Sequence, residues 1–407
     1  MTEVTSRALL DGVERDATAS CPSCGSHGLA IFHEQHGIPV HSCRLVSTRE
    51  EAETFPRGDL RLGFCSRCGF ITNTAFKASV QDYSLAYEET QGFSPRFQEF
   101  MRDLAIRLVD RHDLRDRNLL EIGCGKGEFL LLMCELGPNH GVGIDPSFVE
   151  DRIESEAATR IRFIKDLYSE RYAHLAGDFV ICRHTLEHIQ QTGDFLRLLR
   201  RSIGERRDVV LFFELPETMR VLREVAFWDL YYEHCSYFTS GSLARLFRLA
   251  GFEVTEIDLD YDDQYILLEA RPVDAGVGTP FQLEEKPEEV VEAIDHFRIA
   301  FSRTIDSWRR DLRELHAKGG RAVVWGSGSK GVSFLTTLEI HDEIELVVDV
   351  NPYKHGKYMA GTGQMIVAPE QLAAYQPDLV IAMNPIYLEE IRADLARMEI
   401  DARLVAA

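Results

Sequence analysis

The sequence contains little of what characterises membrane or nucleic-acid-binding proteins. In its 407 residues, no apolar run approaches the roughly 20 residues that a transmembrane helix needs. Asp and Glu number 66 against 45 Lys and Arg, and the formal net charge of -21 lacks the cationic field that attracts nucleic acid or anionic membrane. No internal repeat and no low-complexity block is present. We therefore expect neither nucleic acid nor membrane as a partner.

A disulfide framework and a secretory signal are also lacking. The nine cysteines are an odd number, and most of them stand in apolar or Cys-x-x-Cys contexts. Such usage favours reduced thiols over a disulfide-stabilised secreted fold. The first twenty residues hold no basic segment followed by an apolar one. These features predict a cytoplasmic protein, and they leave open whether it is a monomer or a homodimer.

The sequence does contain short apolar strands that alternate with helical segments from residue 118 onward. This alternation is typical of a parallel α/β sheet with crossover helices. Five strands are predicted at 118–123, 140–145, 160–165, 178–183 and 208–215. Segments 252–260 and 265–272 follow with no helical stretch between them, which predicts an antiparallel edge pair. Upstream, residues 94–113 have apolar side chains at helical spacing, with Ser94 as the N-cap.

Breaks in these patterns predict the domain organisation. Residues 273–285 lack periodicity, and a long helix begins near Pro287 and ends at Gly319–Gly320. The fold class is α/β, with a Rossmann-like central domain and a second Rossmann-like α/β domain at the C-terminal end. The predicted parts are a zinc-binding module at 1–80, the central domain at 81–272, a linker and long helix at 273–320, and the C-terminal domain at 321–407.

Four cysteines in the N-terminal module form two Cys-x-x-Cys-Gly knuckles. Cys21 and Cys24 make the first, and Cys65 and Cys68 make the second. Two knuckles supply four thiolates for a tetrahedral Zn2+, and a closed thiolate shell predicts a structural metal. Two redox pairs or unligated thiols are the alternatives. Cys43 is a rival ligand that lacks a partner knuckle.

A glycine-rich loop follows the first strand of the central domain. Glu121 ends the strand, and Gly123, Gly125 and Gly127 precede a helix. Glycines let the backbone approach a ligand where any Cβ would collide, although they also suit a tight strand–helix turn. Asp145 ends the next strand, where a carboxylate can bind both ribose hydroxyls of an adenosine.

This loop and the segments after it resemble the class I S-adenosylmethionine-dependent methyltransferases, whose cofactor loop begins with E-x-G-x-G-x-G. The resemblance covers about residues 118–272. It implies S-adenosylmethionine as the cofactor, with Asp166 near the adenine and Leu167 as its apolar cover. The cofactor-binding residues that it implies are Glu121, Gly123, Cys124, Gly125, Gly127, Asp145, Pro146, Asp166, Leu167 and His184.

Two segments offer groups that could deprotonate or orient a methyl acceptor. They are "RHTLEHI", with His184, Glu187 and His188, and "YYEHCSYF", with Glu233 and His234. An electrophilic methyl requires a nucleophilic acceptor, and both segments follow strand ends where open α/β sheets bind ligands. Structural roles are the alternatives, such as a histidine that caps a strand. The aromatic residues that would wall such a pocket are Tyr231, Tyr232, Tyr237 and Phe238.

The three-part layout also carries a narrower resemblance. The zinc knuckles, "LEHI", "YYEHCSYF" and the later "WGSGSKG" are similar to features of the nucleotide-sugar C-methyltransferases, which methylate the 3-position carbon of TDP-linked 4-keto-deoxysugars. The resemblance implies that His234 removes the proton alpha to the ketone, and that the enolate attacks the methyl group. It implies that Glu233, Tyr231 and His188 position the sugar or stabilise the enolate. It also places a tyrosine at the site, Tyr87 with Tyr83 as the fallback.

The sequence departs from that family after the first edge strand, where members tend to carry a His-Gly-Gly-Ser type turn. This chain has Asp262, Asp263 and Gln264 there, which would change the polarity of the pocket. The sugar and the methylated atom therefore stay open. An O- or N-methyltransferase acting on a sugar or natural-product intermediate is one alternative. A zinc-knuckle binding module joined to an inactive methyltransferase fold is the alternative from another class.

A second glycine-rich loop opens the C-terminal domain, with Gly326, Gly328 and Gly331 in GxGxxG spacing and Asp349 at the end of the next strand. Taken alone, this pattern favours a dinucleotide such as NAD. The family resemblance instead implies contact with the nucleotide of a nucleotide-linked sugar, and a purely structural loop is the third reading. The cations that could bind a diphosphate are Lys330, Lys354, His355 and Lys357.

Overall fold

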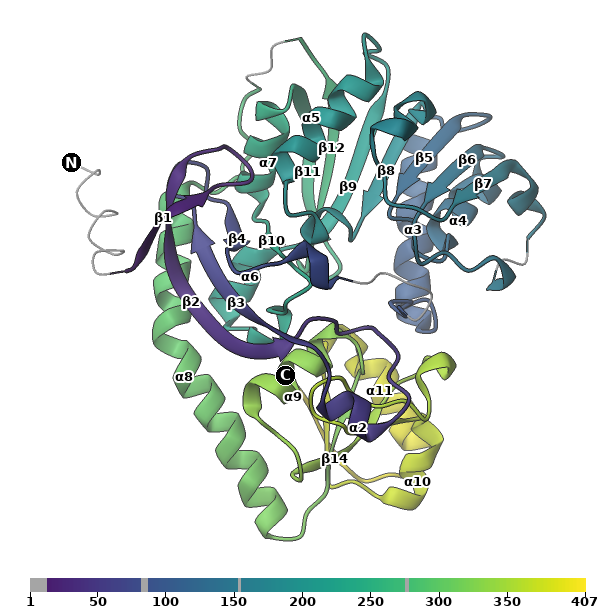
Figure 1. The fold of residues 1–407 in the computed structure, drawn as a ribbon. Coiled ribbons are helices and arrows are strands. Elements are labelled where there is room, and N and C mark those ends of the chain that lie inside the picture. The colour runs from purple at the N-terminus through teal and green to yellow at the C-terminus, as the bar shows by residue number, and fades with distance from the viewer. Residues whose placement is uncertain (1–12, 82–86, 153–154, 275–277) are drawn as a thin grey trace.

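The computed structural model describes residues 13–81, 87–152, 155–274 and 278–407. Three sheets define an N-terminal, a central and a C-terminal domain, and the long helix α8 (Pro287–Ala317) runs beside the first sheet toward the third (Figure 1). None of the helices in these ranges is long and apolar enough to cross a membrane.

The N-terminal sheet is antiparallel and takes its last strand from the central part of the chain. Its order is β1-β2-β3-β4-β10. The strands are β1 (Arg15–Ser20), β2 (His27–Pro39), β3 (Arg57–Phe64), β4 (Ile71–Asn73) and β10 (Ser236–Tyr237). Because β10 begins two residues after His234, its pairing with β4 fixes the Glu233–His234 dipeptide against the N-terminal domain. Helix α2 (Arg49–Glu53) lies between β2 and β3 in the chain.

The central sheet has the order β11-β12-β9-β8-β5-β6-β7. Its strands are β5 (Asn118–Ile122), β6 (His140–Ile144), β7 (Ile161–Ile164), β8 (Phe179–Arg183), β9 (Val210–Pro216), β11 (Phe252–Asp260) and β12 (Tyr265–Pro272). Strands β5 to β9 are parallel, and β11 and β12 form the expected antiparallel edge pair. The five predicted parallel strands and this edge pair are confirmed.

Helices cover both faces of the central sheet, and its strands are therefore buried on both sides. On β8, Phe179 and Ile181 pack in one cluster, whereas Val180 and Cys182 pack in another. This alternation follows from the period of two along a strand. Helices α3 (Pro95–Arg111) and α4 (Glu128–Leu136) cover the first face. Helices α5 (Thr192–Ile203) and α7 (Ser240–Leu249) cover the second.

The C-terminal sheet is parallel throughout, with the order β15-β14-β13-β16-β17. Its strands are β13 (Ala322–Trp325), β14 (Ile344–Val348), β15 (Met365–Val367), β16 (Leu379–Ala382) and β17 (Arg403–Ala406). Its helices are α9 (Ser329–Leu338), α10 (Leu372–Tyr375) and α11 (Leu388–Arg397). The predicted second Rossmann-like unit is therefore present.

The segment before the Glu233–His234 dipeptide is anchored by aromatic packing between domains. Helix α6 (Thr218–Glu224) leads into a short turn, Phe227–Asp229. Phe227, 1% exposed, stacks on Phe334 of α9 with ring centroids 5.7 Å apart and also meets Phe301 of α8. Burying a phenylalanine stabilises a fold by about 2–3 kcal/mol, so this contact holds the segment in place.

Candidate active site

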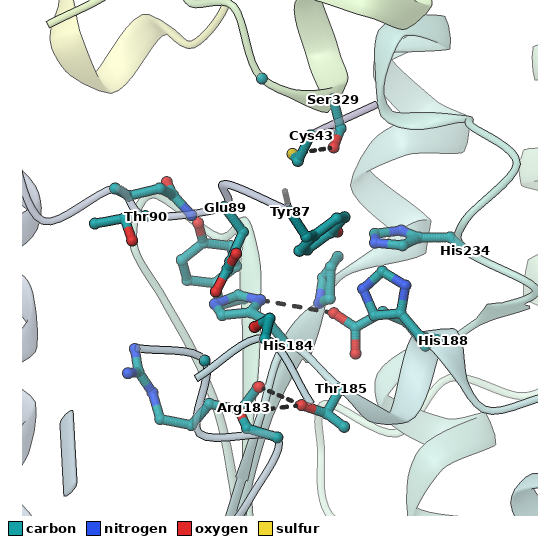
Figure 2. A pocket seen from close by; sticks show the side chains of 18 of the residues that line it. Cys43, Tyr87, Glu89, Thr90, Arg183, His184, Thr185, His188, His234 and Ser329 are labelled. Atoms are coloured by element: carbon teal, nitrogen blue, oxygen red, sulfur yellow. Dashed lines mark hydrogen bonds and ion pairs between the residues drawn. The ribbon is translucent and has the colours of Figure 1, made fainter. Parts of the chain in front are cut away.

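One cavity of about 940 Å³ lies where the three domains meet, and both glycine-rich loops line it. In the central sheet the strand order reverses between β5 and β8, and in the C-terminal sheet it reverses between β13 and β16. Open α/β sheets bind ligands outside the carboxyl ends of the strands at such a reversal. The cavity therefore joins the two expected ligand positions. Figure 2 shows Arg183 and Thr185 at one end of it and Ser329 at the other.

The first glycine loop has the backbone that a close ligand approach requires. Gly123, Gly125 and Gly127 have φ values of 72°, 53° and 85°. A Cβ added at Gly123 would lie 1.9 Å from Thr185 Oγ1, so only glycine fits there. Asp145 accepts hydrogen bonds from the amides of Gly125 and Ser147, at 2.9 and 2.7 Å, which orient its carboxylate at the cavity wall.

The other residues expected to bind the cofactor also line this cavity, namely Glu121, Cys124, Pro146, Asp166, Leu167 and His184. Burial raises the pKa of Glu121 to about 7. Leu167 is 64% exposed, and it lines the cavity next to Asp166. Gly127 caps helix α4, and it supports the loop from behind the cavity wall.

His184 is held as a cation rather than as a base. Burial disfavours the charged imidazole, but Glu214, whose Oε1 lies 2.8 Å from His184 Nε2, outweighs it together with Glu187 and raises the pKa of His184 to about 9. Arg183 donates two further bonds to the same carboxylate. The positive charge of His184 therefore faces the cavity at neutral pH.

His234 lies in the cavity wall as a neutral imidazole. It is 6% exposed, and burial lowers its pKa well below the usual value. Its ring lies 4.2 Å from that of Tyr231 and 4.9 Å from that of His188, centroid to centroid. His188 Nδ1 donates to the backbone carbonyl of Glu233 at 3.1 Å. Figure 2 shows His188 and His234 side by side, with Tyr87 nearby. A neutral imidazole in this place can accept a proton.

Glu233 lies behind the cavity wall, which corrects the expectation that it positions the sugar. Its side chain is fully buried and does not line the cavity. The carboxylate accepts a hydrogen bond from His41 Nδ1 at 2.8 Å and another from the amide of Ser42 at 2.9 Å. Burial alone would raise the pKa of Glu233, but His41 holds it below its usual value. Glu233 thus anchors His234 to the N-terminal domain.

Tyrosines contribute hydroxyl groups to the same wall. Tyr231 and Tyr87 line the cavity, and Tyr87 is 8% exposed. Burial raises the pKa of Tyr231 well above 10, so its phenol stays protonated and can donate. The His41 ring contacts Tyr87 edge-on, at 6.1 Å between centroids. The fallback Tyr83 lies outside the described residues.

Sequence reasoning missed several residues that the fold brings to the cavity. Glu89 reaches the glycine loop, and burial raises its pKa to about 7. Lys126 donates to the carbonyls of Tyr87 and Ser147, both at 2.8 Å, which ties the segment after residue 86 to the cofactor loop. No sequence pattern could have identified His41, because nothing in "IPVHSC" indicates that its partner is the distant Glu233.

Where the C-terminal domain lines the cavity, the Asp349 carboxylate is bound by residues of its own domain. It accepts from the amide and hydroxyl of Ser327 and from the amide of Asn351, and Lys354 Nζ lies 3.5 Å away. Asp145 accepts a similar set of bonds from its own loop, so the ion pair with Lys354 is what distinguishes Asp349. Neutralisation by Lys354 makes this carboxylate a weaker acceptor for the ribose hydroxyls of a dinucleotide such as NAD.

The cations expected at a diphosphate divide into two groups. Lys330 and Lys354 line the cavity, whereas His355 and Lys357 do not. Lys330 Nζ binds Asp229 at 3.1 Å and Gln264 Oε1 at 3.0 Å, so a phosphate would have to displace these partners.

The turn between β11 and β12, which holds Asp262, Asp263 and Gln264, lies only partly in the cavity lining. Asp262 and Asp263 are exposed and lie outside the cavity lining, which corrects the expectation that they set its polarity. Gln264 is buried in the lining and bonds Asn384 of the C-terminal domain at 3.0 Å.

The four knuckle cysteines come together as a quartet. Their Sγ atoms lie within 4.8 Å of one another, with Cys21–Cys68 and Cys24–Cys65 both at 3.6 Å. Four thiolates at this spacing fit a tetrahedral Zn2+. Cys43 instead lies at the cavity, where its Sγ contacts Ser329 Oγ at 3.4 Å, so it is no rival ligand.

Comparisons with known proteins agree with this geometry. Residues 95–257 match the family model described as "Methyltransferase domain", and residues 270–406 match "C-methyltransferase C-terminal domain". The curated C-methyltransferase NovU from Streptomyces niveus is 28% identical over 310 residues, which cover 72% of each chain. A tRNA U34 carboxymethyltransferase from Sulfurimonas denitrificans is 25% identical over 124 residues, 28% of this chain and 40% of that protein.

Among solved structures, a match is the dimethyltransferase RosA from Streptomyces davawensis. It is 19% identical and covers 44% of this chain and 56% of its own, with a TM-score of 0.35. The two family matches and the curated relative, together with the open glycine loop, support S-adenosylmethionine binding and transfer of a methyl group to carbon. The chain is an S-adenosylmethionine-dependent methyltransferase.

Proposed function

We propose that this methyltransferase alkylates the carbon alpha to the ketone of a nucleotide-linked keto-deoxysugar, with His234 as the general base. The observation that carries the proposal is the place of His234 in the cavity wall. The cofactor loop lies at one end of that cavity and the C-terminal glycine loop at the other. A substrate with a reactive sugar and a nucleotide has the two-part shape that such a cavity accepts.

The chemistry assigns a task to each group. Bound S-adenosylmethionine supplies the electrophilic methyl. The His234 lone pair takes the proton alpha to the ketone, and the C–H electron pair becomes the enolate. Tyr231, a protonated phenol, and His184, a cation, are the donors that can stabilise the negative charge on the enolate oxygen. His188 orients the segment through its bond to the Glu233 carbonyl.

The nucleotide end is proposed to lie against the C-terminal domain. The N-terminus of α9 faces the cavity through Gly328 and Ser329, and unpaired amides of a helix N-terminus attract phosphate. Lys354 adds positive charge at this end. A nucleotide diphosphate would compete with Asp229 and Gln264 for Lys330.

We also propose a structural Zn2+ at the Cys21, Cys24, Cys65 and Cys68 quartet, which lies outside the cavity lining. One knuckle lies between β1 and β2 and the other between β3 and β4, so a metal would tie the two connections together and add folding free energy. Elemental analysis of the purified protein is expected to give one zinc per chain. A zinc-free protein that keeps the same melting temperature would contradict this role.

The function is tested by a screen of keto-sugar nucleotides with S-[methyl-13C]-adenosylmethionine, followed by carbon-13 NMR. A new methyl signal in the range for a carbon-bound methyl group is expected. A signal in the range for an oxygen- or nitrogen-bound methyl group would replace this proposal by the O- or N-methyltransferase alternative. If calorimetry detects no binding of S-adenosylmethionine, the chain does not act as an S-adenosylmethionine-dependent enzyme.

The base is tested separately by exchange of the alpha proton in D2O. His234→Asn is expected to slow exchange by about 10²–10⁴-fold, the usual contribution of a general base, and to leave cofactor affinity within a factor of two. Tyr232→Phe is a matched control, since Tyr232 is a neighbour whose hydroxyl bonds the Lys77 amide outside the cavity. Unchanged exchange in His234→Asn would rule out the base assignment.

A further inference from the structure

A buried carboxylate next to the histidine pair has no role in the chemistry described so far. Glu187 is 2% exposed, lines the cavity and belongs to the short turn Leu186–His188. Neither of its carboxylate oxygens has a hydrogen-bond partner among the described residues. Its ion-pair partner is His184, whose Nδ1 lies 3.7 Å from Oε1 and whose pKa Glu187 helps to raise. Buried carboxylate oxygens without a hydrogen bond are rare, so Glu187, which lines the cavity, can take a further cationic partner that comes and goes.

The histidines supply such a partner. A carboxylate oxygen of Glu187 and one ring nitrogen each of His188 and His234 lie within 4.8 Å of one another. His188 Nδ1 is the donor to the Glu233 carbonyl, because a carbonyl oxygen can only accept. The charge of the Glu233 carboxylate is already matched by His41 on the far side of the wall. Glu187 is therefore the carboxylate that faces the pair from the cavity side.

The other groups around His234 cannot supply a negative charge to a protonated His234. Tyr231 and Tyr237 contact its ring, and both are phenols with a pKa raised by burial. His184 and His188 make a positive charge on His234 less favourable. Asp229, in the same cavity, is paired with Arg220 and Lys330. Glu187 is paired with His184, but His184 lies closer to Glu214 (2.8 Å) than to Glu187 (3.7 Å) and divides its charge between them, so Glu187 keeps negative charge for His234.

We infer that Glu187 is a positioning residue that stabilises the His234 imidazolium during proton abstraction, and that His188 holds the geometry between them. This inference rests on the proposed role of His234 as the base. When the substrate proton bonds to His234, the new positive charge forms within reach of the Glu187 carboxylate, and the electron pair of the broken C–H bond stays on the substrate as the enolate. The proton leaves His234 to water after the methyl group has transferred.

The inference is tested first without substrate, by following histidine ring nitrogens by NMR across a pH titration. His234→Asn identifies the His234 signals. Glu187→Gln is expected to lower the pKa of His234 by more than about one, a tenfold loss of proton affinity, because it removes a charge at short range. Glu89→Gln is the matched control: it removes another cavity-lining carboxylate, at the glycine loop, and is expected to leave the pKa of His234 unchanged. An unchanged pKa in Glu187→Gln would overturn the inference.

A second measurement covers the case in which Glu187→Gln does not fold. In wild-type protein with carbon-13 in glutamate, the carboxyl signal of Glu187 is expected to shift at the pH at which His234 takes its proton. Independence of the two titrations would also overturn the inference. Because these residue types also bind metals, elemental analysis provides another arm. A second metal per chain that is lost in Glu187→Gln would show that the His234 lone pair is occupied by a metal, and the inference would fall.

With substrate, the proposal predicts a specific change in pH dependence. Glu187→Gln is expected to lower the plateau rate of alpha-proton exchange about tenfold and to move its acid limb to lower pH, because a weaker base stays unprotonated to lower pH. Glu187→Asp, which keeps the charge, is expected to recover part of both. If wild-type protein exchanges no alpha proton, the proposed function fails even where the NMR coupling is found. If exchange occurs without coupling, only the present inference fails.

Discussion

The two Rossmann-like sheets of this chain carry the same sequence signature, yet their glycine loops differ in what they leave available. In the central domain, three glycines adopt positive φ, and Asp145 accepts hydrogen bonds from Gly125 and Ser147 of its own loop. In the C-terminal domain, Asp349 accepts similar bonds from Ser327 and Asn351 and is also ion-paired with Lys354. The motif therefore predicts a strand–loop–helix unit, whereas the neighbours of the acidic residue decide whether it can bind a ribose.

The sharpest test of this comparison replaces one glycine of each loop by alanine. Gly123→Ala is expected to weaken S-adenosylmethionine binding by at least about a hundredfold, or ~2.7 kcal/mol, because its Cβ would meet Thr185 and its φ is positive. Gly328 has φ -77° and open space around its Cβ position within the described residues. Gly328→Ala is expected to leave cofactor affinity within twofold. Calorimetry measures both, and equal losses would refute the assignment of the cofactor to the central loop.

The acidic residues provide the next test. Asp349→Asn is expected to lower the free energy of unfolding by about 2–3 kcal/mol, because it leaves the buried Lys354 without its counter-charge. Asp145→Asn is expected to weaken cofactor binding about tenfold with a smaller stability loss, because a neutral amide is a poorer acceptor for ribose hydroxyls. Urea unfolding and calorimetry separate the two effects. A large stability loss in Asp145→Asn would mean that both carboxylates are structural.

The stability of the two domains should also differ in its pH dependence. The folded pKa of His184, about 9, lies above the ordinary 6.5, so its pairing with Glu214 contributes fully below pH 6.5 and is lost as pH rises through 9. His184→Gln is expected to remove an alkaline loss on the order of 2 kcal/mol. Unfolding curves at pH 6, 8 and 9.5 measure it.

A histidine of the other Rossmann-like domain provides the control for this prediction. His355 lies 2.8 Å from a backbone carbonyl rather than a carboxylate. His355→Gln is expected to keep the wild-type alkaline loss. If both variants flatten the pH dependence equally, the loss does not come from the His184–Glu214 pair.

The smallest expected effect concerns the turn between β11 and β12, which contacts the C-terminal domain through Tyr261 and Gln264. Tyr261, Asp262 and Asp263 all have positive φ, between 55° and 61°, which residues with a side chain rarely adopt and which glycine adopts freely. Replacing Asp262 and Asp263 by glycine is expected to raise stability by about 1 kcal/mol and to leave catalysis unchanged, since neither side chain lines the cavity. Thermal unfolding measures the change. A loss of activity would show that these aspartates act on the substrate after all.

Local pattern was sufficient for much of the fold. The parallel strands, the edge pair, the Ser94 cap of α3 and the long helix from Pro287 follow from periodicity and capping chemistry, and the structure confirms them. The Cys quartet follows from the spacing of its knuckles, and the structure brings its sulfurs together. The pairing of β10 with β4 could not be foreseen, because two residues carry too little pattern to name a partner more than 160 residues away.

The site shows the same division between local and distant information. The sequence by itself determined the cofactor loop and the candidate histidines, because glycine φ preferences and strand ends are local properties of the chain. Only the tertiary structure decided that Glu233 turns away toward His41, that Asp349 and Lys330 each have an ion-pair partner, and that Glu187 faces His234. These outcomes depend on which distant residues neutralise each buried charge. Burial makes an unmatched charge costly, so the partner, and not the residue type, decides what each group can do.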